Sequence, residues 1–244
     1  MIKDIYATWG VNGKERHILA HISRTEDNQL KFSYNYEGLY AASKDGLRHF
    51  VGFRKNADKI SSERIEDILS LRVISDKRPD RMELLNFWEV PKLTDKIDIL
   101  AFTQGKSPTD FYEYIPDFTT YPKKSFTFVT DLIGVEDLKL NIDSVKIGDT
   151  LNLFISPNEV FVANDRIGKI GKIKIIHELP FIAGARVKLT VKAIYNSSNY
   201  IKRIFVKVDV IDNTIRFKPF LEKKYESIRG VHNPFLDKFH KQYV

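Results

Sequence analysis

The chain contains no cysteine, and its 244 residues include only two methionines and two tryptophans. Without cysteine it can form neither a disulfide nor a thiolate metal site. No stretch approaches the ~18 consecutive apolar residues of a membrane-spanning helix. Lys3 and Asp4 interrupt the apolar start that a secretory signal peptide would need. We therefore expect a cytoplasmic protein with no membrane partner.

The motifs of common enzyme classes are also missing. The sequence has no Gly-rich phosphate-binding loop, no His-Glu-x-x-His and no Gly-x-Ser-x-Gly. His17 and His21 are four residues apart on an expected strand, which separates them by ~13 Å and is too far for one metal ion. We predict that the chain is not an enzyme and that it has no cofactor and no metal site.

The positive charge is distributed unevenly along the chain. The sequence is 43% hydrophobic, which is enough to build real cores, and its net charge is +7. Residues 1–120 carry 18 Lys and Arg against 19 Asp and Glu, whereas residues 121–244 carry 21 against 13 and a net charge of +8. A basic domain beside a neutral one suggests a polyanion partner, most often nucleic acid. A solvated lysine-rich surface is the alternative.

The chain begins with the pattern of a three-stranded β-meander, expected over residues 4–35. The strand segments are rich in β-forming residues or alternate between apolar and polar side chains. Asn12-Gly13 predicts the first hairpin, because a type I′ turn needs positive φ at both central residues. The three strands are expected at residues 5–9, 17–22 and 30–34.

Helical patterns follow the meander. They predict a helical turn or loop near residues 38–46 and helices at residues 63–71, 79–89 and 95–103. Ser61 or Ser62 can cap the first of these helices, Pro79 suits the first position of the second, and Thr94 can cap the third. Together with the meander they predict an α+β domain over residues 1–120.

The second half is predicted to be a small, mostly β, barrel-like domain over residues 121–220, after a boundary near residues 118–124. Short strands on tight turns are expected at residues 150–155 and 160–163, and the chain then leads out through residues 167–171. Residues 186–194 and 201–210 alternate basic or polar with apolar side chains and predict a hairpin with one apolar and one cationic face. A basic aromatic tail occupies residues 221–244.

The order of these pieces resembles the HIRAN domain. In that family a strand that starts with Gly-Asp-x-Leu-x-Leu is followed by a strand ending in Val and by a Gly-x-x-Ile/Val-Gly turn. The matching segments here are 147–153, 160–162 and 166–170. The resemblance implies a β-barrel-like module of DNA processing, some members of which hold the 3′ end of single-stranded DNA. This chain has only Ser156 to Glu159 where the family has its longer end-binding loop.

The meander is similar to the N-terminal subdomain of HipA-type kinases. The residues that carry this resemblance are Trp9, Asn12, Gly13, Leu30, Phe32 and Tyr34. The segments 76–80 and 105–115 are also similar to the leader that precedes HIRAN modules in a group of bacterial proteins. The chain is too short to contain the catalytic part of such a kinase.

Seven basic residues are the predicted nucleic-acid contacts. They lie in and next to the segment 167–171, which follows the two short strands, and on the first strand of the later hairpin. Phosphates could be neutralised along one face of that strand. Protection of an exposed sheet edge by lysines explains the hairpin residues equally well. The predicted contacts are Arg166, Lys169, Lys172, Lys174, Arg186, Lys188 and Lys192.

Phe235, Phe239 and Tyr243 in the tail are four residues apart and would share one helix face. They could bind a partner protein, stack on bases or dock on the body of the chain. The leading functional hypothesis is a non-enzymatic DNA-binding accessory protein of a bacterial defence, repair or toxin–antitoxin-like system. The alternative is a protein-binding module, such as a HipA-like antitoxin subunit that inhibits a separate kinase.

Overall fold

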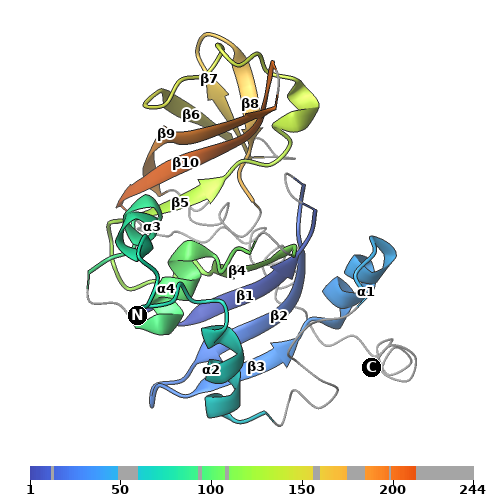
Figure 1. Ribbon diagram of the computed structural model, residues 1–244, viewed down its shortest axis with the longest axis vertical. Helices are drawn as coiled ribbons and strands as arrows, with labels where there is room; N and C mark the ends of the chain where they lie inside the picture. Colours follow the sequence, from blue (N-terminus) through green and yellow to red (C-terminus); the bar gives the residue numbers. More distant parts are fainter. Residues whose placement is uncertain are drawn as a thin grey trace.

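Two antiparallel sheets of four and six strands carry the fold of this computed structural model (Figure 1). Four helices accompany them within the described part of the chain, so the predicted α+β class is confirmed. The structure describes residues 1–11, 14–48, 60–92, 95–107, 110–155, 160–174, 185–197 and 199–212, apart from the side chains of Thr119 and Ile155. None of the helices described there is both long and apolar enough to span a membrane.

The four-stranded sheet has the order β3-β2-β1-β4. The predicted meander is confirmed, because β1, β2 and β3 are antiparallel neighbours. The fourth strand, β4, lies more than a hundred residues further along the chain and pairs with β1. All five residues of β4 are buried, so burial does not alternate along this strand. The strands are β1 (Asp4–Trp9), β2 (His17–Arg24), β3 (Leu30–Tyr34) and β4 (Tyr112–Pro116).

Helices cover both faces of this sheet. Ile65 of α2 and Leu100 of α4 are buried in the same cluster as Ile5 of β1, whereas Ala42 of α1 packs in a separate cluster with Trp9. The helices are α1 (Tyr36–Lys44), α2 (Ser62–Ser70), α3 (Arg81–Phe87) and α4 (Lys96–Thr103).

The capping predictions are partly confirmed. Ser61 caps α2, but Asp95 rather than Thr94 caps α4, because its carboxylate accepts a hydrogen bond from the Asp98 amide. Pro79 precedes α3 by two residues and does not open it.

The six-stranded sheet has the order β5-β10-β9-β6-β7-β8 and curls into a half-barrel. Its two edges meet where Ile133, just after β5, forms an antiparallel bridge with Lys172 of β8. The predicted strands and the predicted long hairpin are confirmed. The strands are β5 (Phe126–Asp131), β6 (Thr150–Ile155), β7 (Val160–Asn164), β8 (Gly168–Lys172), β9 (Arg186–Ser197) and β10 (Tyr200–Asp212), and short 3-10 helices lie at η2 (Phe118–Thr120) and η3 (Glu136–Leu138).

The segment around the predicted domain boundary is part of a shared core. The ring of Phe118 lies 4.5 Å from that of Phe128 on β5, and Tyr121 packs edge-on against Phe126 at 5.0 Å between centroids. Residues 122–125 are exposed, whereas Phe118 and Tyr121 are buried. One buried cluster contains residues of both sheets, so the division into two domains stays a prediction about independent folding.

Helix α3 forms a second contact between the halves. Trp88 is the C-cap residue that follows this helix, and it is buried against Phe205 of β10 and Val129 of β5. The rings of Trp88 and Phe205 meet edge-to-face at 5.9 Å between centroids. In Figure 1 α3 lies beside β5 and β10, on the outer face of the half-barrel.

Several predicted features lie outside the described residues. They include the central residues of the first hairpin turn and the loop of residues 156–159 between β6 and β7. The whole predicted tail of residues 221–244 belongs to them, with its candidate partner-binding residues Phe235, Phe239 and Tyr243.

Candidate nucleic-acid interface

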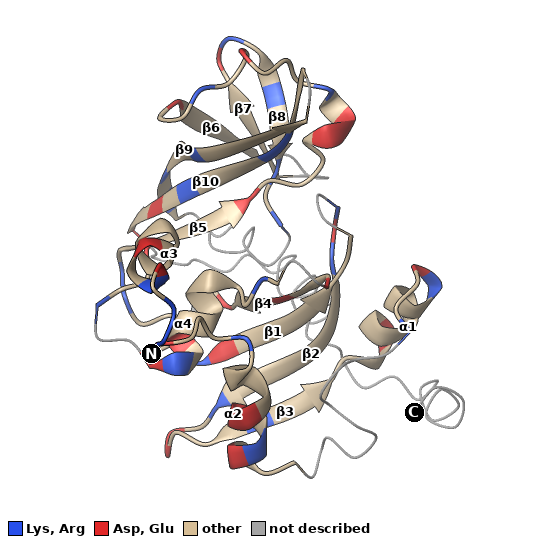
Figure 2. Ribbon diagram, in the orientation of Figure 1, with Lys and Arg blue, Asp and Glu red and all other residues tan. Residues whose placement is uncertain are grey.

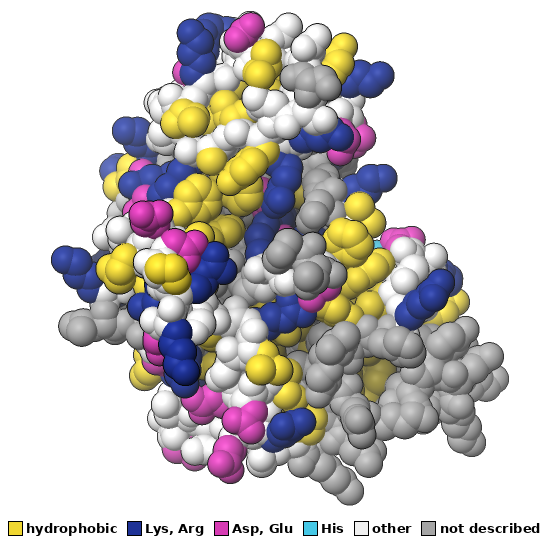
Figure 3. Space-filling model, viewed as in Figure 1, with side chains coloured by type: hydrophobic (Ala, Val, Ile, Leu, Met, Phe, Trp, Pro, Cys, Tyr) yellow, Lys and Arg dark blue, Asp and Glu magenta, His cyan; other side chains and the backbone are white. Residues whose placement is uncertain are grey.

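The predicted basic contacts do not form one patch. Lys and Arg side chains are dispersed over the face of the molecule seen in Figure 3, with acidic side chains among them. Arg166 lies in the turn between β7 and β8, and its Nη2 donates to Asp149 Oδ2 at 2.8 Å. Lys169 and Lys172 both lie on β8 and are half-buried. The Lys169 ammonium lies 5.1 Å from the centroid of the Phe161 ring.

Arg186 and Lys188 are exposed on β9, as predicted for a cationic strand face. Across the hairpin, however, Lys188 is paired with Asp209 and Arg186 with Asp212 on β10. Figure 2 shows basic and acidic segments together on β10. Opposite charges on neighbouring strands weaken the field that a phosphate backbone would meet at this face.

Lys192 lies where the register of the hairpin shifts, between the pairs Val191–Val206 and Ala193–Phe205. Its ammonium forms an ion pair with Glu89, just after α3, and lies 5.5 Å from the centroid of the Phe87 ring. Lys192 is therefore half-buried and engaged in the contact between the halves, unlike the exposed Arg186 and Lys188.

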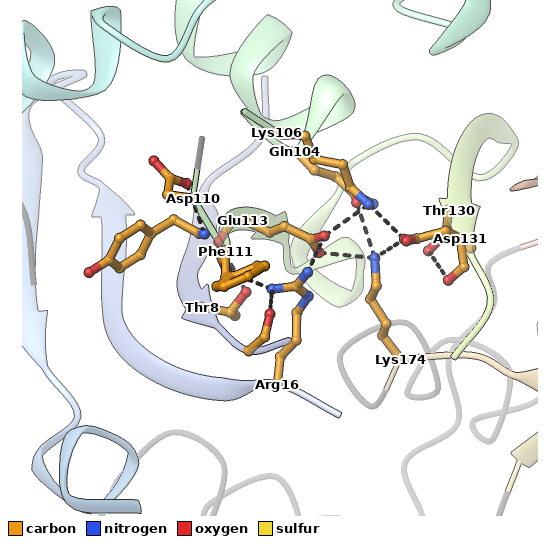
Figure 4. Close-up of polar contacts among 12 residues, drawn as sticks. Thr8, Arg16, Gln104, Lys106, Asp110, Phe111, Glu113, Thr130, Asp131 and Lys174 are labelled. Atoms are coloured by element: carbon orange, nitrogen blue, oxygen red, sulfur yellow. Dashed lines mark hydrogen bonds and ion pairs between the residues drawn. The ribbon is translucent and has the colours of Figure 1, made fainter. Parts of the chain in front are cut away.

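Lys174 is buried, with a side chain that is 3% exposed. Its Nζ lies 3.0 Å from Glu113 Oε2 and donates to Asp131 and to Gln104 Oε1. Figure 4 shows the ammonium pointing between the two carboxylates. Lys174 thus has no exposed ammonium to offer to a phosphate, contrary to its predicted place on the cationic surface.

Lys174 belongs to a buried charge cluster that joins the two halves. Glu113 on β4 lies 2.5 Å from Arg16 and 2.8 Å from Lys106, while Asp131 at the end of β5 lies 2.7 Å from both Lys106 and Arg203. Four basic groups thus surround two carboxylates, which leaves a formal charge of +2. The members of the cluster are Arg16, Lys106, Glu113, Asp131, Lys174 and Arg203.

The charges and the burial of the cluster change the pKa values of its own members. Burial alone would raise the pKa of Asp131, but the charges of Lys106, Lys174 and Arg203 outweigh it and hold that pKa well below its usual range. Burial lowers the pKa of Lys106 to about 8, against the opposing effect of the Asp131 charge. Burial would also raise the pKa of Glu113, but the charges of Lys174 and Lys106 outweigh it and lower that pKa. Both carboxylates therefore remain ionised, and they tie strands of the two sheets together.

An aromatic pair, with one exposed and one half-buried ring, lies on the outer face of the half-barrel. Phe154 of β6 and Phe161 of β7 are directly opposite in register, and their rings are stacked 5.2 Å apart at an interplanar angle of 9°. Phe154 is 46% exposed. Phe161 is in turn opposite Lys172 of β8. We call Phe154, Phe161, Lys169 and Lys172 the aromatic platform.

The two phenylalanines were missed by the sequence analysis, although β6 carries a signal for them. Leu151 and Leu153 alternate with Thr150 and Asn152 along this strand, which assigns the apolar residues to the core. Phe154 falls on the polar phase of that alternation. A large apolar residue at an outward position of a strand is the pattern that indicates an exposed ring.

Within the residues that the structure describes, no three His, Cys, Asp or Glu side chains gather where they could hold a metal ion. No family model, no curated protein and no solved structure matches this chain.

Proposed function

We propose that the chain is a non-enzymatic protein that binds single-stranded DNA through the aromatic platform. The observation that carries this proposal is the stack of the exposed Phe154 ring on the half-buried Phe161 ring, with the Lys169 ammonium next to Phe161. Proteins that bind single strands combine aromatic rings, on which bases stack, with cations that follow the phosphate backbone. The aromatic platform offers both groups on three adjacent strands.

The exposure of the Phe154 ring favours a binding role over a purely structural one. A cross-strand aromatic pair also stabilises the hairpin that carries it, by roughly 0.2–1 kcal/mol. That role does not require Phe154 to keep nearly half of its surface in water, where each apolar Å² costs about 25 cal/mol relative to burial. A base stacked on the ring would remove this surface from water and gain about 1–3 kcal/mol.

Stacking is tolerant of sequence, because every base presents a π-face. We therefore propose that the platform reads the presence of unpaired bases and not their identity. Lys169 and Lys172 supply the phosphate contacts, and their contribution is expected to weaken as salt rises.

We also propose that the second half is a divergent HIRAN-like module. The support for this proposal is the motif residues between Ile147 and Ile170. The meander resembles the HipA N-terminal subdomain through Trp9 and the Leu30–Tyr34 strand. The alternative function, binding of a separate kinase, rests on the neutral charge of the first half and on the aromatic tail.

The variant Phe154→Ala tests the proposed function. Loss of one stacking contact worth about 1–3 kcal/mol would lower the affinity for a labelled single-stranded oligothymidylate by about 5- to 150-fold. Fluorescence anisotropy at fixed ionic strength measures this change. The fold should be maintained, because the side chain is half exposed, and circular dichroism checks it.

Tyr40→Ala is the matched control. Tyr40 on α1 is also 46% exposed and has the Lys44 ammonium 4.1 Å from its ring centroid. This substitution therefore removes a ring of equal exposure and similar chemistry from the other half. We expect its affinity to equal that of the wild type. A folded Phe154→Ala variant that binds as tightly as the wild type would reject the aromatic platform as the site.

A further inference from the structure

A groove lies beside the aromatic platform, between the half-barrel and the first half of the chain. It has a volume of about 330 Å³. Lys169 and Lys172 of β8 line it on one side, and Lys14, which precedes β2, lines it from the first half. Gly134 also lines the groove, and the space where its Cβ would lie is open, so that a ligand could approach the backbone there.

The groove and the aromatic platform are continuous because they share two lysines. Lys169 lies next to the Phe161 ring, and Lys172 is opposite Phe161 in the β7–β8 register. Both lysines also line the groove. A strand whose base is stacked on the phenylalanines would therefore meet the groove with its adjacent phosphate.

The charge of the groove suits a phosphodiester. Its lining has three lysines and two carboxylates, those of Glu15 and Asp137, and hence a formal charge of +1. A phosphodiester carries a single negative charge, which matches that excess. A more highly charged anion would meet the two carboxylates without full compensation.

The buried charge cluster fixes the two sides of the groove relative to each other. Arg16 and Lys174 both reach Glu113, at 2.5 Å and 3.0 Å. Lys14 precedes Arg16 by two residues, and Lys172 precedes Lys174 by two residues. One carboxylate thus anchors both segments that present groove lysines. The Ile133–Lys172 bridge secures β8 from its other side.

We infer that this groove holds the phosphodiester next to the stacked base, and that Lys14 supplies a phosphate contact from the first half of the chain. The inference rests on the proposed function. It assigns a DNA-binding role to a residue of the neutral half, which the charge distribution along the sequence does not suggest. Docking of the two halves is then a requirement for full affinity.

The variant Lys14→Gln tests this inference, with Lys3→Gln as the matched control, because Lys3 is another exposed lysine of the first half. Loss of one phosphate contact should reduce the slope of log affinity against log salt by about 0.7, and lower the affinity for single-stranded oligothymidylate about 3- to 5-fold near physiological salt. Lys14→Glu should lower it further, because it places a repelling charge in the groove. Lys3→Gln should leave both the slope and the affinity unchanged.

The binding data for these variants distinguish a failure of the groove inference from a failure of the proposed function. If both Lys14 variants bind like the wild type while Phe154→Ala loses affinity, the groove inference is overturned and the proposed function stands. If Phe154→Ala also binds like the wild type, the proposed function fails together with the groove. An equal loss in Lys14→Gln and Lys3→Gln would show a general charge effect and would also overturn the inference.

Discussion

Replacement of Asp131 by asparagine should destabilise the protein strongly, although it changes the side-chain volume very little. The Asp131 carboxylate is 2% exposed and accepts hydrogen bonds from Lys106 and Arg203, both at 2.7 Å, and from Lys174. An amide cannot compensate these cations. Asp131→Asn would leave Glu113 as the single carboxylate among the four basic groups of the buried charge cluster.

The expected loss is about 3–5 kcal/mol of unfolding free energy, the range for removal of one partner from a buried ion pair. Single domains have about 5–15 kcal/mol in total, so the variant should unfold at a clearly lower urea concentration. Glu136→Gln is the control, because Glu136 forms a 3.1 Å ion pair with Lys202 in which both side chains are about half exposed or more. Such a pair contributes about 0–1 kcal/mol.

The difference in unfolding free energy between wild type and Asp131→Asn should depend on pH in one direction. Because the pKa of Asp131 is held well below its usual range, its contribution is present above the unfolded-chain pKa of about 3.9. It is lost as the pH falls from there through the lower native pKa. Urea denaturation near pH 7 should show the full difference, and more acidic buffers should reduce it. A loss below about 1 kcal/mol at pH 7 would refute the assignment of Asp131 as an anchor of the cluster.

Two further predictions concern Lys106 and the DNA end. The native pKa of Lys106, about 8, lies below its ordinary value of 10.5, so the folded state loses this proton first. The unfolding free energy of the wild type should therefore increase relative to that of Lys106→Met as the pH rises from 8 to 10.5. If urea denaturation gives the same difference in unfolding free energy between the two proteins at pH 8 and at pH 10.5, the lowered pKa of Lys106 is contradicted. Oligonucleotides with a free and a blocked 3′ hydroxyl should bind with similar affinity, because the 156–159 segment is too short for an end pocket and Glu159 would repel a phosphate. A loss of more than ~10-fold on blocking, measured by anisotropy, would show that the chain recognises the end.

Local patterns in the sequence predicted the strands whose two faces differ. The alternation in residues 150–155 and in the β9–β10 hairpin identified these elements, because one face of each packs on the core and the other meets solvent. The strand β4 was not assigned. Its residues are buried on both faces, between β1 and the buried charge cluster, so the alternation that marks a half-buried strand is absent.

The candidate site was less predictable, because its decisive contacts join distant parts of the chain. Lys174 follows Lys169 and Lys172 in a lysine-rich segment, and its burial depends on Glu113 and Asp131, which come from other strands. Lys192 follows the alternation of β9, but the register shift and Glu89 direct it towards α3. Phe154 could have been found from its phase on the strand alone, since it breaks a local rule.

The central claim is that an unpaired base stacks on Phe154, and a thermodynamic cycle tests it most directly. Affinities of wild type and Phe154→Ala are measured for an oligothymidylate and for an abasic strand of equal length, at one salt concentration. Removal of the bases should weaken wild-type binding by at least about 5-fold, the equivalent of 1 kcal/mol of stacking, and should have little effect on the variant. An equal cost of base removal in both proteins would contradict stacking on Phe154 as the basis of binding.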